Sequence, residues 1–329
     1  MDNGTIAAYA AGLRVLALGG LLLGLLPAGA FELQGHRGAR GLLPENTLAG
    51  FEHALEIGVT TLELDIAITA DGIPVVSHDA ELNPALTRDA QGQWLKGKGP
   101  LIRSLSLAQL QRFDIGRLDP AQDYARPFAS QQARDGERIP TLAALFKRVK
   151  ELGADKVQFA IETKIHPDRP NETVGPEEFV DRILAVVREA GMLDRVRILS
   201  FDWRTLQLVQ KIEPSIKTVY ITIENPRQNN VRHAPMTAGF SWRDHASTAH
   251  LIKAAGGSVW SPNFHNIDSG KVKVAQQLGL KVIPWTVNEP VDMDRVIGYG
   301  VDGIVTDYPD RLRDAMRRAG LALPDPVRR

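Results

Sequence analysis

Short apolar runs alternate with segments of helical period from Phe31 onward, and this alternation constrains the fold more than any other feature of the chain. The runs have strand length, and turn residues bound most of them. Strands that alternate with helices are typical of a parallel sheet. The expected strands are 33–36, 61–65, 74–78, 157–162, 196–200, 216–221, 258–261, 281–286 and 303–305. The pattern predicts an α/β protein built on a (β/α)8 barrel, the TIM barrel.

A doubly wound open sheet is the alternative for such an alternation. That fold commonly carries a Gly-x-Gly-x-x-Gly turn after its first strand, where it binds a dinucleotide. No such turn follows the run at 33–36. The closed barrel is therefore the favoured interpretation.

Two long segments interrupt the alternation. Residues 80–139 hold no convincing strand and are rich in Gln, Gly, Arg and Asp, so we interpret them as an insertion after the third strand, with one helix near 106–112. A second long loop, 222–243, follows the sixth strand. Long excursions at strand ends often shape a pocket. We find no domain linker and expect one domain over residues 31–329.

Helix boundaries are marked most clearly at two places. A periodic apolar pattern begins after Asn46 or Thr47, either of which can cap a helix, and stops at Gly58. A second helix is expected to open at Pro176 and to end near Gly191. Its proline and its acidic first turn suit the unpaired amides of a helix start.

The first thirty residues differ from the rest of the chain. Arg14 precedes an apolar stretch at 15–26, and Pro27 and the small residues 28–30 follow it, as in a secretion signal. We expect residues 1–30 to be a signal peptide that is cleaved after Ala30, which predicts a periplasmic or secreted protein. An uncleaved membrane anchor is the rival interpretation, but the apolar run is shorter than the ~20 residues that span a bilayer.

Charge and cysteine content exclude several classes of function. Thirty-nine basic residues balance thirty-nine acidic ones, so the net charge gives no general attraction to nucleic acid or to an anionic membrane. The chain has no cysteine, which rules out disulfides, thiolate metal sites and cysteine nucleophiles. Any bound metal must therefore use oxygen or imidazole ligands.

Glu63 and Asp65 form the first candidate site. They lie two residues apart in an expected strand, so their side chains point to the same face. Two adjacent carboxylates repel each other unless a cation or a proton lies between them, which favours a hard divalent metal. Pairing of both acids with arginines elsewhere is the alternative, and this pair alone does not decide between the two.

A turn signal after Asp65 brings a histidine into the argument. Asp71 and Gly72 separate two apolar runs, which is typical of a hairpin. We expect the chain to descend after Asp65 and to climb again, returning His78 to the level of the carboxylates. His36 and Arg37 end the first expected strand.

Two histidines at strand ends, beside a carboxylate pair and an arginine, form a set with a recognisable chemistry. His36 and His78 can serve as an acid/base pair, the acids can hold a metal, and Arg37 can bind an anion. This combination suits phosphoryl transfer, because a cation neutralises the phosphate while a base and an acid handle the two alcohol oxygens. Cleavage of a phosphodiester is the expected reaction.

The ordered motifs of the chain resemble those of the glycerophosphodiester phosphodiesterase family. Any one of them is weak evidence, but their order and spacing cover essentially the whole chain after residue 30. They are His36-Arg37-Gly38, Pro44-Glu45-Asn46-Thr47, Glu63-x-Asp65, Val75-Val76-Ser77-His78-Asp79, Ile139-Pro140-Thr141-Leu142, Ile161-Glu162-Thr163-Lys164, Ser200-Phe201, Pro284-Trp285-Thr286-Val287-Asn288 and Thr306-Asp307-Tyr308-Pro309.

The resemblance implies a TIM barrel that hydrolyses glycerophosphodiesters, which are small molecules, to sn-glycerol 3-phosphate and an alcohol. It implies that His36 and His78 are the acid/base pair. By the same resemblance, one Mg2+ or Ca2+ would be held by Glu63, Asp65 and Glu162. Arg37 and Lys164 would contact the phosphate, and Trp285 would line the pocket beside the glycerol. Arg88-Asp89-Ala90 departs from the family's usual Arg-Thr-Thr, and Ile-Glu-Thr-Lys from its Ile-Glu-Ile-Lys.

Two other functions are alternatives for this chain. A phospholipase C or a sphingomyelinase-type phospholipase D would keep the barrel and the metal, but residues 31–329 show no basic amphipathic helix for membrane binding. A non-catalytic binding barrel is the second alternative, and it would not need two histidines. His53 and His250 are expected on helices, and His265 in a loop near the pocket mouth. The sequence leaves the oligomeric state and the choice between Ca2+ and Mg2+ open.

Overall fold

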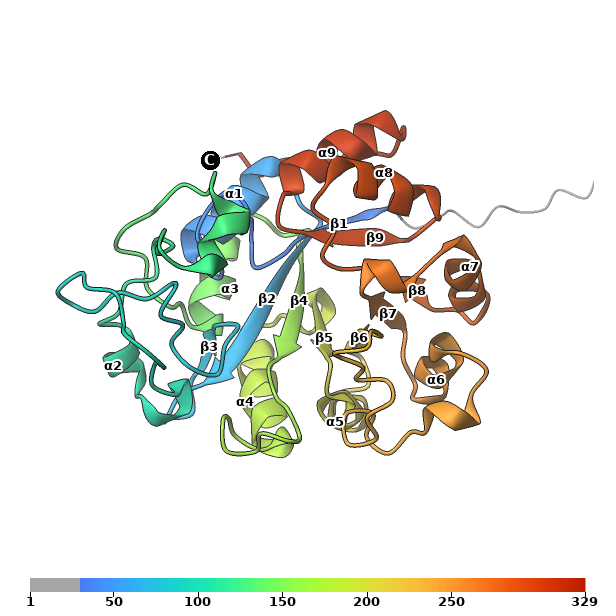
Figure 1. Ribbon diagram of the computed structural model, residues 1–329, viewed down its shortest axis with the longest axis horizontal. Helices are drawn as coiled ribbons and strands as arrows, with labels where there is room; N and C mark the ends of the chain where they lie inside the picture. Colours follow the sequence, from blue (N-terminus) through green and yellow to red (C-terminus); the bar gives the residue numbers. More distant parts are fainter. Residues whose placement is uncertain (1–29, 329) are drawn as a thin grey trace, which may run out of the picture.

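The computed structural model describes residues 30–328, so all but the last residue of the expected signal peptide lies outside the described part of the chain. Among these residues, eight parallel strands follow one another around a nearly closed barrel in the order β8-β7-β6-β5-β4-β2-β1-β9 (Figure 1). Their bounds are β1 Glu32–Gly35, β2 Thr61–Ile68, β4 Gln158–Thr163, β5 Val196–Ser200, β6 Lys217–Thr222, β7 Val259–Pro262, β8 Lys281–Val282 and β9 Gly303–Thr306. The predicted (β/α)8 barrel is confirmed.

Helices surround the barrel on its outer side (Figure 1). They are α1 Leu48–Ile57, α3 Leu142–Glu151, α4 Pro176–Glu189, α5 Trp203–Ile212, α6 Thr248–Ala254, α7 Ser269–Gln277, α8 Pro290–Gly298 and α9 Pro309–Arg318. The predicted limits of α1 are correct: the Thr47 hydroxyl accepts from the amide of Gly50, and Gly58 ends the helix with a φ of 93°. Within the described residues, every helix is too short or too polar to cross a bilayer.

Strand β8 is shorter than the predicted run at 281–286. Pro284 has no amide hydrogen, so a regular ladder cannot continue through it. Single hydrogen bonds replace the ladder: the amide of Ile283 donates to the carbonyl of Trp260 at 2.9 Å, and the amide of Val305 donates to the carbonyl of Pro284 at 3.0 Å. These bonds join β8 to β7 and to β9 and close the barrel.

The hairpin at Asp71 exists, but it runs in the opposite direction to our expectation. Strand β2 does not turn down after Asp65; it continues outward to Ile68, and the antiparallel strand β3 (Pro74–Val76) returns along it. The amide of Ser77 then donates to the carbonyl of Asp65 at 2.9 Å. The return still brings the segment that carries His78 back to the level of Asp65.

The segment between β3 and α3 contains only short helices, η1 (Ile102–Ser104), α2 (Leu107–Leu110) and η2 (Asp123–Phe128). It extends from one side of the barrel, beside the β2–β3 hairpin (Figure 1). Its buried apolar side chains form a small core of their own with the hairpin. That core contains Ala67, Val75, Leu82, Ile102, Leu110 and Ile139. The segment is therefore packed onto the barrel mouth and does not form a separate unit.

The barrel interior has three levels, because alternate residues of each strand point inward. At the amino-terminal end, Glu32 accepts from Arg197 at 2.6 Å and from Lys281 at 3.1 Å. A layer of apolar side chains lies above this charged group. It consists of Ala160, Leu199, Val219, Ile221, Val259, Ile283 and Val305. The next inward positions, at the carboxyl ends of the strands, carry the acids and histidines singled out in the sequence.

The turn after β1 is tightly packed against α1. Gly38 has a φ of +89°, and a β-carbon placed there would lie 2.8 Å from the carbonyl carbon of Gly50. Arg37 also has a positive φ, of 49°. A left-handed conformation is costly for residues with a side chain, so surrounding contacts must hold this turn in place.

We expect Gly38→Ala to destabilise the protein more than Gly300→Ala. Both glycines have positive φ, but Gly300 has no atom within 4 Å of the added β-carbon. Each change should lower the free energy of unfolding by about 1 kcal/mol because of the left-handed conformation. Gly38→Ala should lower it by about 1–3 kcal/mol more because of the clash. Urea unfolding of the two variants measures the difference. Equal losses would contradict the packing argument.

Candidate active site

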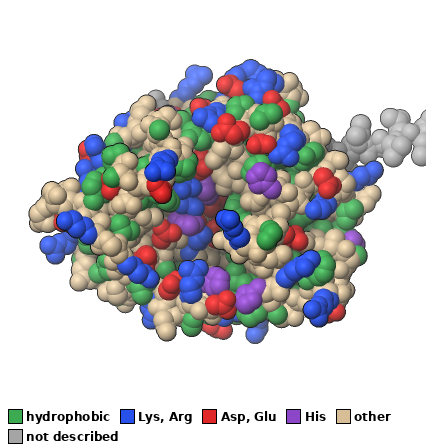
Figure 2. Space-filling view, in the orientation of Figure 1, with side chains coloured by type: hydrophobic (Ala, Val, Ile, Leu, Met, Phe, Trp, Pro, Cys, Tyr) green, Lys and Arg blue, Asp and Glu red, His purple; other side chains and the backbone are tan. Residues whose placement is uncertain are grey.

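The inward-facing polar residues meet at the carboxyl-terminal mouth of the barrel, where enzymes of this fold carry their active sites. Figure 2 shows a hollow on this face in which basic, acidic and histidine side chains gather. His36 follows β1, Glu63 and Asp65 lie on β2, and Glu162 lies on β4 directly beside Asp65 in the ladder. Strand register, which the sequence does not state, brings these residues together.

Glu63, Asp65 and Glu162 form a buried carboxylate cluster. One oxygen from each lies within 4.8 Å of the others. Burial and the neighbouring acids raise the pKa of Glu63 well above its usual range. Burial also raises the pKa of Glu162, to about 7, although Lys164 opposes the shift. Without a cation, this cluster therefore holds at least part of a proton at neutral pH.

Basic groups on both sides hold the cluster in place. The amide of Arg37 donates to Glu63 at 2.9 Å, and the Arg37 Nε lies 3.2 Å from Asp65 Oδ2. The Lys164 ammonium donates to Glu162 at 2.8 Å and lies 3.7 Å from Asp65 Oδ1. Burial opposes ionisation of Asp65, but Arg37, His78 and Lys164 together hold its pKa below the usual value.

The donor set fits a hard divalent cation. It consists of carboxylate oxygens alone, as Mg2+ and Ca2+ prefer. The Asp65 Oδ1 atom is buried and accepts no hydrogen bond, which is costly for a charged oxygen. A cation bound by this oxygen and the two neighbouring glutamates would satisfy it and remove their mutual repulsion.

His36 is fixed by a carboxylate behind it. Its Nδ1 lies 2.6 Å from Oδ1 of Asp307, and the other carboxylate oxygen of Asp307 accepts from the side-chain amide of Asn288 at 2.7 Å. An anionic Asp307 can only accept, so it places the proton on Nδ1 and leaves Nε2 with a lone pair. That Nε2 points toward the carboxylate cluster, 3.9 Å from Glu63 Oε2.

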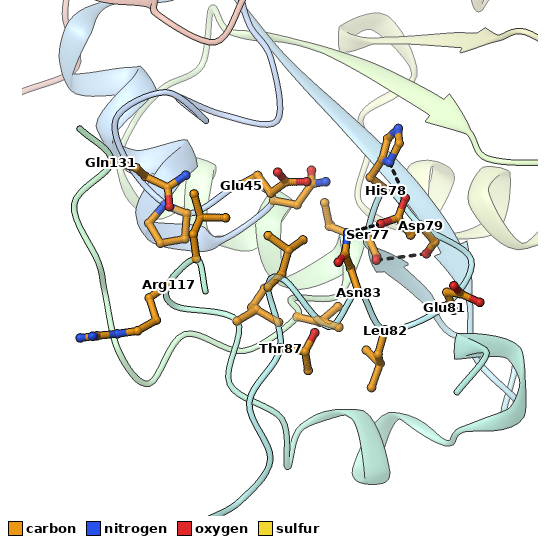
Figure 3. A pocket seen from close by; sticks show the side chains of 17 residues that line it. Glu45, Ser77, His78, Asp79, Glu81, Leu82, Asn83, Thr87, Arg117 and Gln131 are labelled. Carbon is orange, nitrogen blue, oxygen red and sulfur yellow. Dashed lines mark hydrogen bonds and ion pairs between the residues drawn. The ribbon is translucent and has the colours of Figure 1, made fainter. Parts of the chain in front are cut away.

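His78 has a matching arrangement on the other side. Its Nδ1 lies 2.8 Å from Oδ1 of Asp79, and Asp79 Oδ2 accepts from the side-chain amide of Asn83 at 2.8 Å. Figure 3 shows this His78, Asp79 and Asn83 chain at the edge of a small pocket beneath the insertion. Each histidine is thus backed by an aspartate, and each aspartate by an asparagine.

Both imidazoles have lowered pKa values. Burial lowers the pKa of His36, and Asp307 only partly compensates. Burial, followed by Lys164 and Arg37, lowers the pKa of His78 to about 4. Both rings are therefore neutral at pH 7 in the free protein, and a bound anion would raise both values.

The Arg37 side chain is held by an acid that we did not predict. Its Nη1 donates to Glu45 at 2.7 Å, and Glu45 also binds Arg40 and the hydroxyl of Tyr124. Tyr124 comes from η2, so this network ties the insertion to the turn after β1. Only 8% of the Arg37 side chain is exposed.

Trp285 and Lys164 lie around the same hollow. The Trp285 ring packs edge-on against Phe201 with centroids 5.3 Å apart, and its Nε1 donates to the carbonyl of Ser261. The Lys164 ammonium is 5.9 Å from the centre of the Phe201 ring. All eight residues singled out in the sequence thus belong to this end of the barrel. His53 and His250 lie on α1 and α6, as expected, and His265 is exposed after β7.

Asp307, Asp79 and Glu45 were not assigned a role from sequence. Each lies in a motif that carried the resemblance, and Asp307 directly follows β9, as His36 follows β1. The position after a barrel strand was therefore the available signal for Asp307. Glu45 gave no such signal, because its partners Arg40 and Tyr124 are brought to it only by folding.

Comparisons with known proteins point to one family. Residues 36–311 match the model of the glycerophosphoryl diester phosphodiesterase family. A glycerophosphodiester phosphodiesterase of Caldanaerobacter subterraneus is 29% identical over 87% of this chain and 97% of its own. A crystal structure from Silicibacter pomeroyi, whose name assigns it provisionally to the same enzymes, is 36% identical, covers 90% of this chain and 96% of its own, and has a TM-score of 0.81.

A phosphodiesterase of Oleispira antarctica, solved with the product sn-glycerol-3-phosphate, shares the fold. It is 23% identical, covers 86% of this chain and 96% of its own, and has a TM-score of 0.64. The family match spans most of the chain, including every predicted site residue. The chain therefore belongs to the glycerophosphoryl diester phosphodiesterase family and is a phosphoric diester hydrolase.

Proposed function

We propose that this protein hydrolyses glycerophosphodiesters to sn-glycerol 3-phosphate and an alcohol, with His36 and His78 as its acid/base pair. The observation that supports this most is the placement of two imidazoles, each backed by an aspartate, around one buried carboxylate cluster. Cleavage of a phosphodiester requires one proton to leave the attacking oxygen and one to reach the departing alcohol. The product complex of the Oleispira antarctica relative supports the choice of substrate.

Glu63, Asp65 and Glu162 would hold one Mg2+ or Ca2+. When bound, the cation supplies positive charge that stabilises the phosphate as its negative charge is redistributed. Lys164 and Arg37 would contact the same phosphate from the protein side. Ion pairs with Glu162, Asp65 and Glu45 fix the positions of both side chains.

Proton transfer would divide between the two histidines according to their surroundings. The His36 side chain is 13% exposed and its Nε2 carries a lone pair, so it would take the proton from the attacking oxygen, either the glycerol 2-hydroxyl or water. His78 is 30% exposed and faces the open side of the site. It would take up a proton when the anionic substrate binds and deliver it to the leaving alcohol. Trp285 would lie beside the glycerol.

Location remains a prediction. Residues 1–30 would direct export, and the domain at 31–329 would act in the periplasm or outside the cell.

We expect His36→Ala and His78→Ala each to lower kcat by at least about 100-fold, the usual loss of acid/base help. Release of glycerol 3-phosphate from glycerophosphocholine measures the effect, and circular dichroism checks that the fold is kept. His53→Ala, on the surface of α1, is the matched control. Near wild-type turnover in either site variant would refute the assignment.

Metal binding should depend on pH. Because Glu162 has a pKa of about 7, a proton must leave before the cation binds, so affinity should rise with pH. We expect Mg2+ or Ca2+ to bind about tenfold more tightly at pH 8 than at pH 6 by calorimetry, and chelator to abolish turnover until metal is restored. Glu162→Gln should flatten the pH dependence. Full activity in excess chelator would contradict the metal assignment.

Asp307→Asn tests the positioning of His36. An asparagine amide can donate to Nδ1, which moves the ring proton to Nε2 and removes the lone pair from the site. We expect kcat to fall about 100-fold and the nitrogen NMR shifts of His36 to report the other tautomer. Asp314→Asn, on the exposed side of α9, is the control. An unchanged tautomer with unchanged kcat would exclude this role.

A further inference from the structure

The open side of the site leads into a second compartment. A pocket of about 600 Å3 begins at His78, Glu162 and Lys164 and extends away from them between the loops after β4 and β6. This volume lies within the roughly 300–1,000 Å3 typical of small-molecule sites. His36, Glu63 and Trp285 are not among the described residues that line this pocket. A substrate phosphate at the carboxylate cluster would therefore direct its leaving alcohol, next to His78, into this pocket.

Two loops meet across the pocket through one ion pair. Asp168, in the loop after β4, lies 2.9 Å from Nε2 of His233, in the loop after β6. The amide of Asp168 also donates to Nδ1 of His166 at 3.2 Å. Gln228 and Asn229 line the same wall. These side chains present both hydrogen-bond donors and acceptors at short spacing, as adjacent hydroxyl groups require.

The charged side chains that line the pocket nearly balance one another. Among the described residues, four are acidic (Asp79, Glu162, Asp168 and Glu172) and three are basic (Lys164, Arg169 and Arg227). Glu172 pairs with Arg169 at 3.2 Å and Glu162 with Lys164 at 2.8 Å. The pocket therefore gives a cationic ligand no strong electrostatic attraction.

Aromatic rings are also scarce in the pocket. Phe201 is the one benzene-type ring among the lining residues described, and the Lys164 ammonium already lies on its ring. A quaternary ammonium is usually held by several aromatic faces. The pocket lacks such a cage.

We propose that this pocket is a leaving-group subsite for uncharged polyhydroxy alcohols such as glycerol or inositol, with the Asp168–His233 pair as its specificity determinant. The proposal rests on the proposed function and adds the class of alcohol that the enzyme releases. Glycerophosphoglycerol and glycerophosphoinositol are then preferred substrates. Glycerophosphocholine would bring a cation into a pocket that has no aromatic cage and would leave the polar groups of the wall without hydrogen-bond partners, which is the costly kind of mismatch.

The test compares kcat/KM for glycerophosphoglycerol and glycerophosphocholine on the intact, metal-loaded enzyme. We expect the wild type to favour glycerophosphoglycerol by at least about tenfold. Asp168→Asn and His233→Ala should each reduce that ratio several-fold. Arg227→Gln should reduce it as well, by improving the use of glycerophosphocholine. Asp294→Asn, which breaks the exposed ion pair with Arg318 on α8 and α9, is the matched control and should leave the ratio unchanged.

The outcomes distinguish failure of the polyol subsite from failure of the proposed phosphodiesterase function. Equal use of both substrates, or a preference for glycerophosphocholine, overturns the polyol subsite and leaves the phosphodiesterase function intact. A ratio that Asp168→Asn and His233→Ala do not change, in variants with wild-type melting temperatures, overturns the role of the ion pair. Absence of glycerol 3-phosphate release from either substrate overturns both the subsite and the proposed function.

Discussion

Repulsion among three buried carboxylates is the constraint on which the rest of this site depends. Glu63, Asp65 and Glu162 are at most 7% exposed and lie close together, so their charges cannot be screened by water. Arg37 and Lys164 offset part of the repulsion, and protons or a cation must offset the remainder. A fold that buries such a cluster gives up stability there, which is typical of a functional site and not of a structural core.

The hairpin formed by β2 and β3 solves a geometric problem of the parallel barrel. Parallel strands need a long crossover between them, so consecutive strand ends are far apart in sequence. Strand β3 instead folds back on β2, so that the chain is again beside Asp65 at Ser77. This brings His78 into the neighbourhood of Asp65, while His36 lies beside Glu63. The insertion then covers the hairpin, and Tyr124 from its η2 helix braces the turn that carries Arg37.

The two halves of the site differ in openness. His36 and Asp307 lie in an enclosed corner formed by β1, β9 and the insertion, where a bound group has one orientation. His78 borders a wide, polar pocket between long loops, and its lining residues come from segments that follow four strands. An enclosed side suits the constant part of a substrate, and an open side suits the variable part.

Sequence alone determined the barrel and the helix limits at Thr47 and Gly58, because strand periodicity and capping are local properties of the chain. The ordered motifs predicted eight site residues, and the fold brings these to one end of the barrel. Sequence alone misjudged the direction of the hairpin after Asp65 and the length of β8, since both depend on which neighbouring strand accepts each hydrogen bond. Only the tertiary structure paired His36 with Asp307, 271 residues away, and His233 with Asp168 across a pocket. Such pairings are set by barrel closure and loop packing, which no local pattern encodes.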